Sequence, residues 1–285
     1  MIQFTFNKGF RMTELKKGFT KDLSNDIYHA DRSHISSSGL KLLLEDPRQF
    51  EKVYVLDEPS AGKSSAAMDF GSFVHCLILE PHLLEEEFAV CRNAKVKRGA
   101  EWDKFKEANE GKTLIMESQE KIAFSAVDLY RRAKVVIGDK EKKVSSFFEK
   151  GEAEESLCGE LMGIKVKVRF DYRREFAKFG SINDIKTTSF PINSKAEIEE
   201  VCKRWGYEVS AALYVDLVSQ ETGKQHDFFF CFINSKDNVV QLVKASDQML
   251  EAGRTKYKEA LRRLKLARET GEYYDKGVME VDYRE

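Results

Sequence analysis

Hydrophobic and polar residues alternate strictly over residues 164–171, where every even position is apolar and every odd position is charged. A period of two residues is typical of a β-strand with one buried face. We therefore predict a strand here, with a partner strand over residues 153–160 and a hairpin turn at Met162 and Gly163 between the two.

The rest of the C-terminal half continues with short apolar runs and helical patterns. In order, we predict a third strand over 180–187 reached through a polar connection over 173–179, a helical segment over 198–217 interrupted near Gly206, strands over 228–233 and 239–243, and a terminal helix over 247–269. Strands that alternate in this way with helices predict a mixed α/β (α+β) fold, in which a central mixed sheet is flanked by helices.

The N-terminal half has a helical period instead. Ser37 or Ser38 can cap a helix through Leu44, and Asp46-Pro47 supplies the N-cap and first helical residue of the next helix. The remaining predicted elements are a helix over 68–79, a loop or arm over 91–113, and a helix whose apolar face carries Ile122, Ala126, Leu129, Ala133 and Val136.

The change of period near Gly151 divides the chain into unequal regions. We expect an N-terminal appendage over residues 1–25, a helical part over 26–145, and an αβ part over 146–285 that ends in a basic helix. Met12 offers an alternative start, so the first eleven residues are expected to have little structural role.

Composition excludes several classes of protein. The 285 residues carry 47 Lys and Arg against 48 Asp and Glu, for a net charge of −1, so an anionic partner must meet a local basic patch. The five cysteines are widely spread without a C-x-x-C pair, which favours free thiols in a reducing compartment over a zinc ribbon or an iron–sulfur cluster. No apolar run approaches the length of a membrane span or a secretory signal, so we expect a cytoplasmic protein.

The strand over 180–187 contains the first candidate site, Asp184-Ile185-Lys186. Alternation places Asp184 and Lys186 on one face, and an antiparallel neighbour can bring Asp171 beside them. Two carboxylates bind a hard divalent cation such as Mg²⁺, and a nearby lysine can orient or help to deprotonate a water, as phosphodiester hydrolysis requires. A solvent-facing ion pair on a sheet explains the same pattern, and spacing alone does not decide between the two.

Other candidates are weaker. His75 on an apolar helix is more often a core residue than a ligand, and Glu154-Glu155 is an acidic doublet of the kind that is usually solvated. Gly62-Lys63-Ser64 imitates a phosphate loop but has Asp57 where that loop needs glycine, which argues against a nucleotide-hydrolysing switch. Two basic segments, Arg92 to Arg98 and Arg254 to Arg268, either contact nucleic acid or are ordinary solvated surfaces.

Taken together, four blocks resemble the RecE-type, exonuclease VIII-like branch of the PD-(D/E)xK nuclease superfamily, found in phages and prophages. They are Tyr28–Asp31 with Ile35–Lys41 and Asp46-Pro47; Ala67–Gly71 with His75 and Leu79–Pro81; Ala153–Ser156 with Val168–Asp171 and Ile182–Thr188; and Trp205–Tyr214. The match runs from about residue 20 to about residue 245, in order.

The resemblance implies roles for individual residues. It assigns His75, Asp171 and Asp184 to a metal site and Lys186 to the catalytic lysine, and it places Glu154 near the site with a register uncertain by one against Glu155. Residues implied to contact DNA are Thr187, Thr188, Ser210 and Tyr214, to which the basic cluster adds Lys97 and Arg98. Ser210 stands where the family has glutamine, which puts processivity or end preference in doubt more than metal binding.

The function implied is that of a Mg²⁺-dependent DNA exonuclease in which Mn²⁺ can substitute. The resemblance implies 5′ to 3′ digestion of double-stranded DNA ends, which exposes a 3′ strand for a RecT-type annealing protein, and a toroidal homo-oligomer that concentrates basic faces around DNA. The alternatives are a structure-specific endonuclease, a RecB-like nuclease module of a larger complex, and a catalytically inactive DNA-binding protein.

Overall fold

The computed structural model of the chain describes residues 15–21, 23–58 and 65–274. The alternative start at Met12, the first eleven residues and the segment around Gly62 lie outside these ranges.

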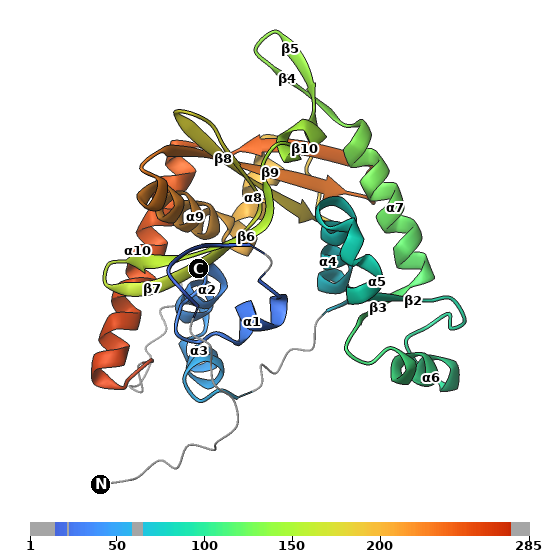
Figure 1. Cartoon of the computed structure of the whole chain (residues 1–285), viewed down its shortest axis with the longest axis horizontal. Helices are drawn as coiled ribbons and strands as arrows, with labels where there is room; N and C mark the ends of the chain where they lie inside the picture. Colours follow the sequence, from blue (N-terminus) through green and yellow to red (C-terminus); the bar gives the residue numbers. More distant parts are fainter. Residues whose placement is uncertain (1–14, 22, 59–64, 275–285) are drawn as a thin grey trace, which may run out of the picture.

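A six-stranded mixed sheet occupies the centre of the molecule, with strand order β1-β6-β7-β8-β9-β10 (Figure 1). The strands are β1 (Gly18–Thr20), β6 (Glu152–Leu161), β7 (Ile164–Glu175), β8 (Phe179–Thr187), β9 (Gln225–Asn234) and β10 (Val239–Lys244). Neighbours are antiparallel except β8 and β9, which are parallel. The predicted mixed α/β fold with a central mixed sheet is therefore confirmed.

The local signals for this sheet act as the sequence predicts. Met162 and Gly163 form the β6–β7 turn with φ values of 53° and 78°, and two-residue hairpins favour positive φ at both positions. The parallel pairing of β8 with β9 needs a crossover, which α8 (Lys195–Trp205) and α9 (Tyr207–Thr222) supply. Gly206, in the left-handed conformation, ends α8 and produces the predicted interruption.

Helices cover both faces of the sheet (Figure 1). On one side lie α2 (Ser37–Glu45), α3 (Pro47–Tyr54), α9 and α10 (Asp247–Thr270), whose apolar side chains share a core with Phe170, Phe228 and Phe230. On the other side, α4 (Ala66–Leu79) and α7 (Glu117–Arg132) pack on Ile185 and Ile233. Ser36 caps α2, one residue before the predicted caps, and Asp46 caps α3 with Pro47 in its first turn.

The predicted loop over 91–113 is wrong in part. It contains α6 (Ala100–Ala108), flanked by the parallel strands β2 (Phe88–Cys91) and β3 (Thr113–Met116). Trp102 of α6 packs with Cys91 and Met116 in a small separate core. Trp102 is the buried residue through which α6 packs on this core. Its contacts lie outside the helix, so the local pattern of the sequence does not reveal them.

The helix predicted to continue through Val136 ends at Arg132. The next residues form the hairpin of β4 (Lys134–Ile137) and β5 (Lys140–Lys143), which projects from the end of α7 (Figure 1). The buried face of α7 consists of Ala123, Ala126, Val127 and Tyr130, whereas the predicted face residue Ile122 is 48% exposed. The buried face is therefore rotated by about one residue from the predicted face, because tertiary packing determines which side of the helix is buried.

The smaller elements are α1 (Asn25–Ala30), α5 (Leu84–Glu87) and the 3₁₀ turns Pro81–Leu83 and Val144–Phe148. All five cysteines are buried and unpaired. Within the described ranges, no helix is both long enough and apolar enough to cross a membrane.

Candidate metal centre

Asp171 lies where the central strands β7 and β8 separate. Their ladder ends at the pair Tyr172 and Asn183. One residue further, Asp171 Oδ2 accepts a hydrogen bond of 2.6 Å from the backbone N–H of Ile185. The carboxylate thus replaces the next backbone hydrogen bond between the two strands. If the β7–β8 register is extended by one residue pair, Asp171 lies opposite Asp184.

Glu154 occupies the corresponding position on β6. The residues on either side of it pair with β7, but Glu154 has a φ of 48° and stands outside the ladder. A left-handed conformation at a residue other than glycine costs on the order of 1–3 kcal/mol and concentrates at functional sites. Glu155 instead is buried and accepts a hydrogen bond of 2.7 Å from Arg173 Nε, so Glu154 is the member of the doublet that faces Asp171.

His75 reaches the sheet from α4. Its Nδ1 lies 3.5 Å from Asp171 Oδ2, and ligand atoms of His75, Glu154 and Asp171 all lie within 4.8 Å of one another. Gly71 allows this close approach, because a Cβ at that position would stand 3.2 Å from Thr187 Oγ1 of β8. Packing of α4 on β8 therefore delivers the imidazole to the two carboxylates.

Lys186 and Asp184 complete the cluster from β8. Lys186 Nζ lies 2.5 Å from Asp184 Oδ2 and 5.5 Å from the ring centroid of Tyr207. Within the described chain, Asp184 Oδ2 is buried and makes no hydrogen bond of good geometry, so this ion pair is its compensation. The predicted placement of Asp184 and Lys186 on one face, beside Asp171, matches this arrangement.

The charges of the cluster are incompletely balanced. Burial raises the pKa of Asp171, and burial together with the Asp171 carboxylate raises the pKa of Asp184 to about 6. Burial and Asp171 also raise the pKa of Glu154. Burial opposes the charge of Lys186, but Asp184 and Asp171 outweigh it and raise its pKa. Burial, then Lys186, lower the pKa of His75 to about 4.

This donor set fits a divalent cation. Three carboxyl groups face one ammonium group, so a bound cation would favour their ionised forms. Neutral imidazole is the form that binds metals, and the lowered pKa of His75 keeps the ring neutral at pH 7. Carboxylate oxygens with one imidazole suit magnesium or manganese. Among the described residues, the ligand atoms that lie together belong to His75, Glu154 and Asp171. The resemblance implies Asp184 in place of Glu154, and Asp184 instead pairs with Lys186.

The residues predicted to contact DNA are placed unequally. Thr187 ends β8 and lies beside Gly71 of α4. Thr188 Oγ1 accepts a backbone hydrogen bond in the following loop. Ser210 is half-buried on α9, and the ring of Tyr214 packs edge-on against Phe170 with centroids 5.7 Å apart. Tyr214 is thus partly a core residue, and contact with DNA remains a prediction for all four.

Lys97 and Arg98 lie on the segment between β2 and α6. Lys97 Nζ is 3.4 Å from Asp69 of α4 and donates a hydrogen bond of 3.1 Å to Leu114 O, whereas Arg98 is exposed. Lys97 therefore fastens its own segment to the fold, in addition to any contact with DNA.

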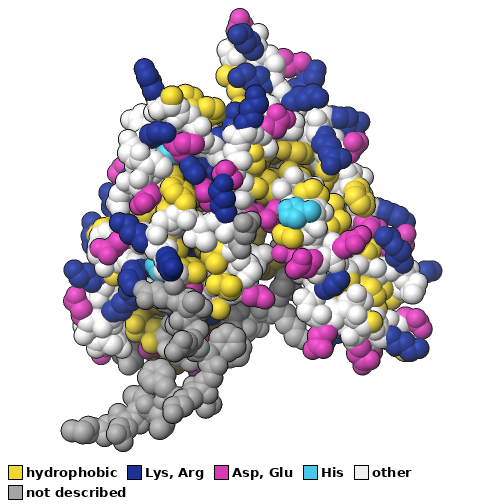
Figure 2. All heavy atoms as spheres, viewed as in Figure 1, with side chains coloured by type: hydrophobic (Ala, Val, Ile, Leu, Met, Phe, Trp, Pro, Cys, Tyr) yellow, Lys and Arg dark blue, Asp and Glu magenta, His cyan; other side chains and the backbone are white. Residues whose placement is uncertain are grey.

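Many cations of the terminal helix α10 also have partners. Arg254 forms hydrogen bonds of 2.8–3.0 Å to Asp216, Lys256 lies 2.5 Å from Glu208, and Glu259 pairs with two arginines. Over residues 254–268 the sequence shows only Glu259 as an opposing charge, because Asp216 and Glu208 belong to α9. Glu251, which also pairs with Arg254, precedes that stretch. Figure 2 likewise shows basic and acidic side chains intermixed on the visible face.

Two groups near the cluster were missed as site residues. Tyr207, within the matched block Trp205–Tyr214, has its ring centroid 5.5 Å from Lys186 Nζ. Glu80, the C-cap residue of α4, adds to burial and Asp171 in raising the pKa of Glu154. Tyr207 follows the end of α8 by two residues and is the first residue of α9. The hydrophobic pattern of the sequence does not predict that its ring lies near Lys186 of β8. Leu79-Glu80-Pro81 carries part of the family resemblance, but nothing in its sequence indicates that Glu80 lies near Glu154.

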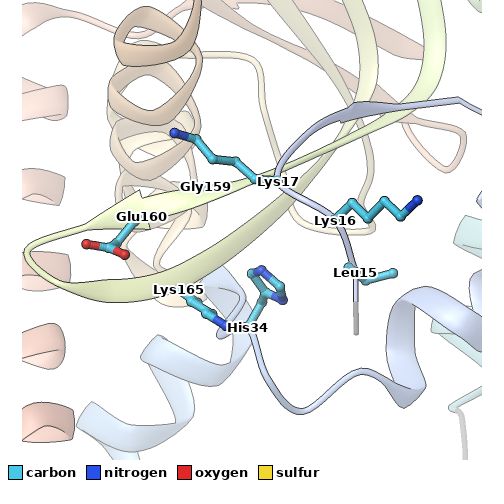
Figure 3. A pocket seen from close by; sticks show the side chains of 7 residues that line it. All are labelled: Leu15, Lys16, Lys17, His34, Gly159, Glu160 and Lys165. Carbon is cyan, nitrogen blue, oxygen red and sulfur yellow. The ribbon is translucent and has the colours of Figure 1, made fainter. Parts of the chain in front are cut away.

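A basic hollow lies elsewhere, along the distal half of the β6–β7 hairpin (Figure 3). Its lining residues are Leu15, Lys16, Lys17, His34, Gly159, Glu160 and Lys165, none of which belongs to the metal cluster. This hollow and the candidate chemistry are therefore separate.

Comparison with known proteins agrees with this architecture. Residues 36–277 match the family described as PDDEXK-like domain of unknown function (DUF3799). A solved structure from Eubacterium rectale, which carries the provisional name of an exonuclease, superposes with a TM-score of 0.61 at 17% identity, over 93% of this chain and 97% of that one.

A second solved structure, of SSO0001, reaches a TM-score of only 0.28 at 13% identity, over 67% of this chain and 85% of that one, and adds no argument. No curated protein matches the chain. At 17% identity the Eubacterium rectale structure supports the fold alone. The family match, in contrast, covers most of the chain, and its PDDEXK name describes the spacing of acids and lysine found at the metal cluster. The chain therefore belongs to the family of PDDEXK-like domains designated DUF3799.

Proposed function

We propose that this protein is a metal-dependent deoxyribonuclease. The observation that carries the proposal is the line of Glu154, Asp171 and Asp184 across three adjacent strands, with His75 against the first two carboxylates and Lys186 against the third. Membership in a PDDEXK-like family and the name of the Eubacterium rectale protein support the same reaction class.

The side chains divide the chemistry between them. His75, Glu154 and Asp171 would hold Mg²⁺, or Mn²⁺ in its place, with Asp184 at the edge of the ligand set. The ion, when bound, supplies charge neutralisation at the phosphate and lowers the pKa of water. Lys186 stays protonated at neutral pH because its pKa is raised. It therefore donates hydrogen bonds to a phosphate oxygen or to the attacking water, and does not act as a general base.

We further propose the exonuclease VIII-like activity. In this proposal the enzyme digests linear double-stranded DNA from 5′ to 3′ and leaves a 3′ strand for a RecT-type annealing protein. The resemblance of the sequence blocks to the RecE branch supports this direction and partner. It also supports a toroidal homo-oligomer, which would gather the remaining basic side chains around DNA in a chain whose net charge is −1.

End-labelled DNA tests the reaction and its direction. Linear duplexes labelled at either the 5′ or the 3′ end, and closed circles, are incubated with the protein in Mg²⁺ or EDTA. We expect Mg²⁺-dependent release of 5′ nucleotides from linear DNA alone, and its loss in Asp184→Ala and Lys186→Met. Glu160→Gln, an exposed change on the neighbouring part of the sheet in β6, is the control and should cleave normally.

Other outcomes decide between the alternatives. Cutting of closed circles at the same rate would make the protein an endonuclease, and release of 3′ label first would reverse the direction. Metal-dependent binding without any cleavage would overturn the assignment as a nuclease.

A further inference from the structure

A second lysine, Lys41 of α2, lies beside the metal centre. Its Nζ donates a hydrogen bond of 3.1 Å to Trp205 O and stands 6.0 Å from the ring centroid of Tyr207. Lys186 Nζ lies 5.5 Å from the same centroid. Two ammonium groups from distant parts of the chain thus surround one phenol ring at the edge of the site.

Gly206 makes room for the Lys41 side chain. The residue has a φ of 59°, and a Cβ added to it would stand 2.9 Å from Lys41 Cδ. The glycine therefore serves two purposes: it ends α8 in a left-handed conformation, and it leaves a passage for the lysine stem. The position of the ammonium group is built into the backbone at the α8–α9 junction.

The ammonium of Lys41 is poorly compensated. Among the described residues, no carboxylate oxygen is found within 4.0 Å of it, and Lys186 repels it. Burial and this repulsion lower its pKa, against the weaker influence of Glu45, Asp184 and Glu208. An ammonium has three donors, and its hydrogen bond to Trp205 O uses one of them. Two donors and an unbalanced positive charge are what a phosphate would satisfy.

Trp205 supplies a second recognition element. It is the last residue of α8, its carbonyl is held by Lys41, and the residue is 51% exposed. An exposed indole next in sequence to this lysine-bound turn is a flat surface on which a base can stack. Single strands of nucleic acid present alternating phosphates and flat bases, which bind to cations and exposed aromatic rings respectively.

We propose that Lys41 and Trp205 form a nucleotide subsite adjoining the metal centre. Lys41 binds a phosphate that neighbours the one to be cut, and Trp205 stacks on a base of the same strand. The ring of Tyr207 lies between Lys41, which binds this phosphate, and Lys186. The subsite rests on the proposed nuclease function and adds to it the path of the strand, which runs from the metal centre across Tyr207 toward the end of α8.

Salt-dependent binding tests the phosphate contact. Lys41→Met keeps the stem that passes Gly206 and removes only the charge. Affinity for a single-stranded oligonucleotide is measured in Ca²⁺, a hard cation that takes the same oxygen ligands, at several salt concentrations. We expect the dissociation constant to rise about tenfold and the slope of its logarithm against the logarithm of salt to fall by about 0.7.

Two matched variants sharpen this test. Lys52→Met removes an exposed lysine of α3 and should leave both quantities unchanged, whereas Lys41→Arg should keep the slope. Circular dichroism and the thermal midpoint verify that each variant is folded. An unchanged slope and dissociation constant in folded Lys41→Met would overturn the phosphate contact.

Tryptophan fluorescence tests the stacking contact. The chain has two tryptophans, Trp102 and Trp205, so Trp102→Phe leaves Trp205 as the only indole. We expect the oligonucleotide to quench its emission, and inorganic phosphate to leave it unchanged. Saturation with the oligonucleotide without any quenching would overturn the stacking.

These binding measurements separate failure of the subsite from failure of the proposed function. If the wild type binds DNA without cleaving it, the nuclease proposal fails while the salt slope and the quenching still judge the subsite. If the wild type cleaves DNA while Lys41→Met leaves the salt slope and dissociation constant unchanged and Trp205 emission is not quenched, the subsite alone is wrong. A wild type that binds no nucleic acid would overturn both.

Discussion

Two clusters of histidine, aspartate and lysine lie four residues apart on strand β7, and they have opposite properties. At the first, Lys167 is buried at 4% exposure and donates hydrogen bonds of 2.5 and 2.6 Å to the carbonyls of Tyr28 and Asp31. Asp31 in turn accepts from Ser33 and His34. At the second cluster, the metal centre, Asp184 Oδ2 is buried without a hydrogen bond from the described residues.

The pKa values of the carboxyl groups report the same contrast. Although burial opposes the charge of Asp31, its hydrogen bond from Ser33 and the ammonium of Lys167 lower its pKa overall. Burial and the Asp171 carboxylate raise the pKa of Asp184 to about 6, against the opposing influence of Lys186. The Lys167 cluster, which contains the sequence block Tyr28 to Asp31, is satisfied by the protein itself and fastens α1 to the sheet. At the metal centre three carboxyl groups share the one ammonium of Lys186, which leaves negative charge for a bound cation to balance.

The largest expected effect is on catalysis at the metal centre. Asp171→Asn keeps an acceptor for the Ile185 N–H but removes a carboxylate from the ligand set. Loss of metal-assisted charge stabilisation amounts to several kcal/mol, so we expect the rate of DNA cleavage to fall about a thousandfold or more. The variant should be at least as stable as the wild type in EDTA, because it relieves repulsion with Glu154 and Asp184.

Initial cleavage rates in Mg²⁺ and thermal midpoints in EDTA measure both parts of this prediction. Added Mg²⁺ should raise the thermal midpoint of the wild type more than that of Asp171→Asn. A variant that cleaves at the wild-type rate would remove Asp171 from the site.

The next effect in size is on stability at the Lys167 cluster. Asp31→Asn leaves the buried ammonium of Lys167 without its carboxylate, and breaking a buried ion pair costs about 3 kcal/mol. We expect the urea midpoint to fall accordingly, while the cleavage rate per folded molecule stays normal. Asp57→Asn is the matched control, because its ion pair with Arg32 is 3.7 Å long and exposed, and exposed pairs contribute little. Equal midpoints for the two variants would contradict the contrast.

The sequence predicts the strands β6 to β10 and the β8 acid–lysine pair from local patterns, but it does not predict the short strands β1 to β5. Sequence patterns fail where tertiary packing determines which side chains are buried. The odd positions of β7 are charged and indicate a solvent-facing side, yet Lys167 is buried because residues 28–35 cover that side and Ile35 pairs with the strand. Neighbouring Glu154 and Glu155 are equivalent in the sequence, and only the left-handed backbone of Glu154 separates their roles.

The same reasoning explains the other misses. The period of α7 continues smoothly into the β-branched residues of β4, so the sequence does not reveal where the helix ends. The sequence does not reveal that Lys41 lies near Lys186, because this proximity depends on how α2 packs against the α8–α9 junction. The partners of the α10 cations are equally invisible, since Asp216 and Glu208 belong to another helix.

The smallest expected effect is a pH dependence of stability that has opposite signs at two residues of the metal centre. Asp184 has a pKa of about 6 in the folded protein against 3.8 for an ordinary aspartate. Between these values the folded state retains a proton that the unfolded state has lost, so its contribution to stability falls as pH rises, by at most about 3 kcal/mol. His75 has a pKa of about 4 against 6.5, so it stays neutral when folded. Its contribution is complete above pH 6.5 and is lost as pH falls toward 4.

Because the two contributions oppose each other, differences between proteins measure them better than the wild-type curve. Urea midpoints in EDTA at pH 4.5 and 6.5 are compared for wild type, Asp184→Asn and His75→Gln. Asp184→Asn removes a contribution that falls with pH, so its stability relative to wild type should increase from the lower to the higher pH. His75→Gln should change in the opposite direction. Parallel curves for all three proteins would show that the metal-free cluster is as well satisfied as the Lys167 cluster, which would remove the physical reason to expect a cation there.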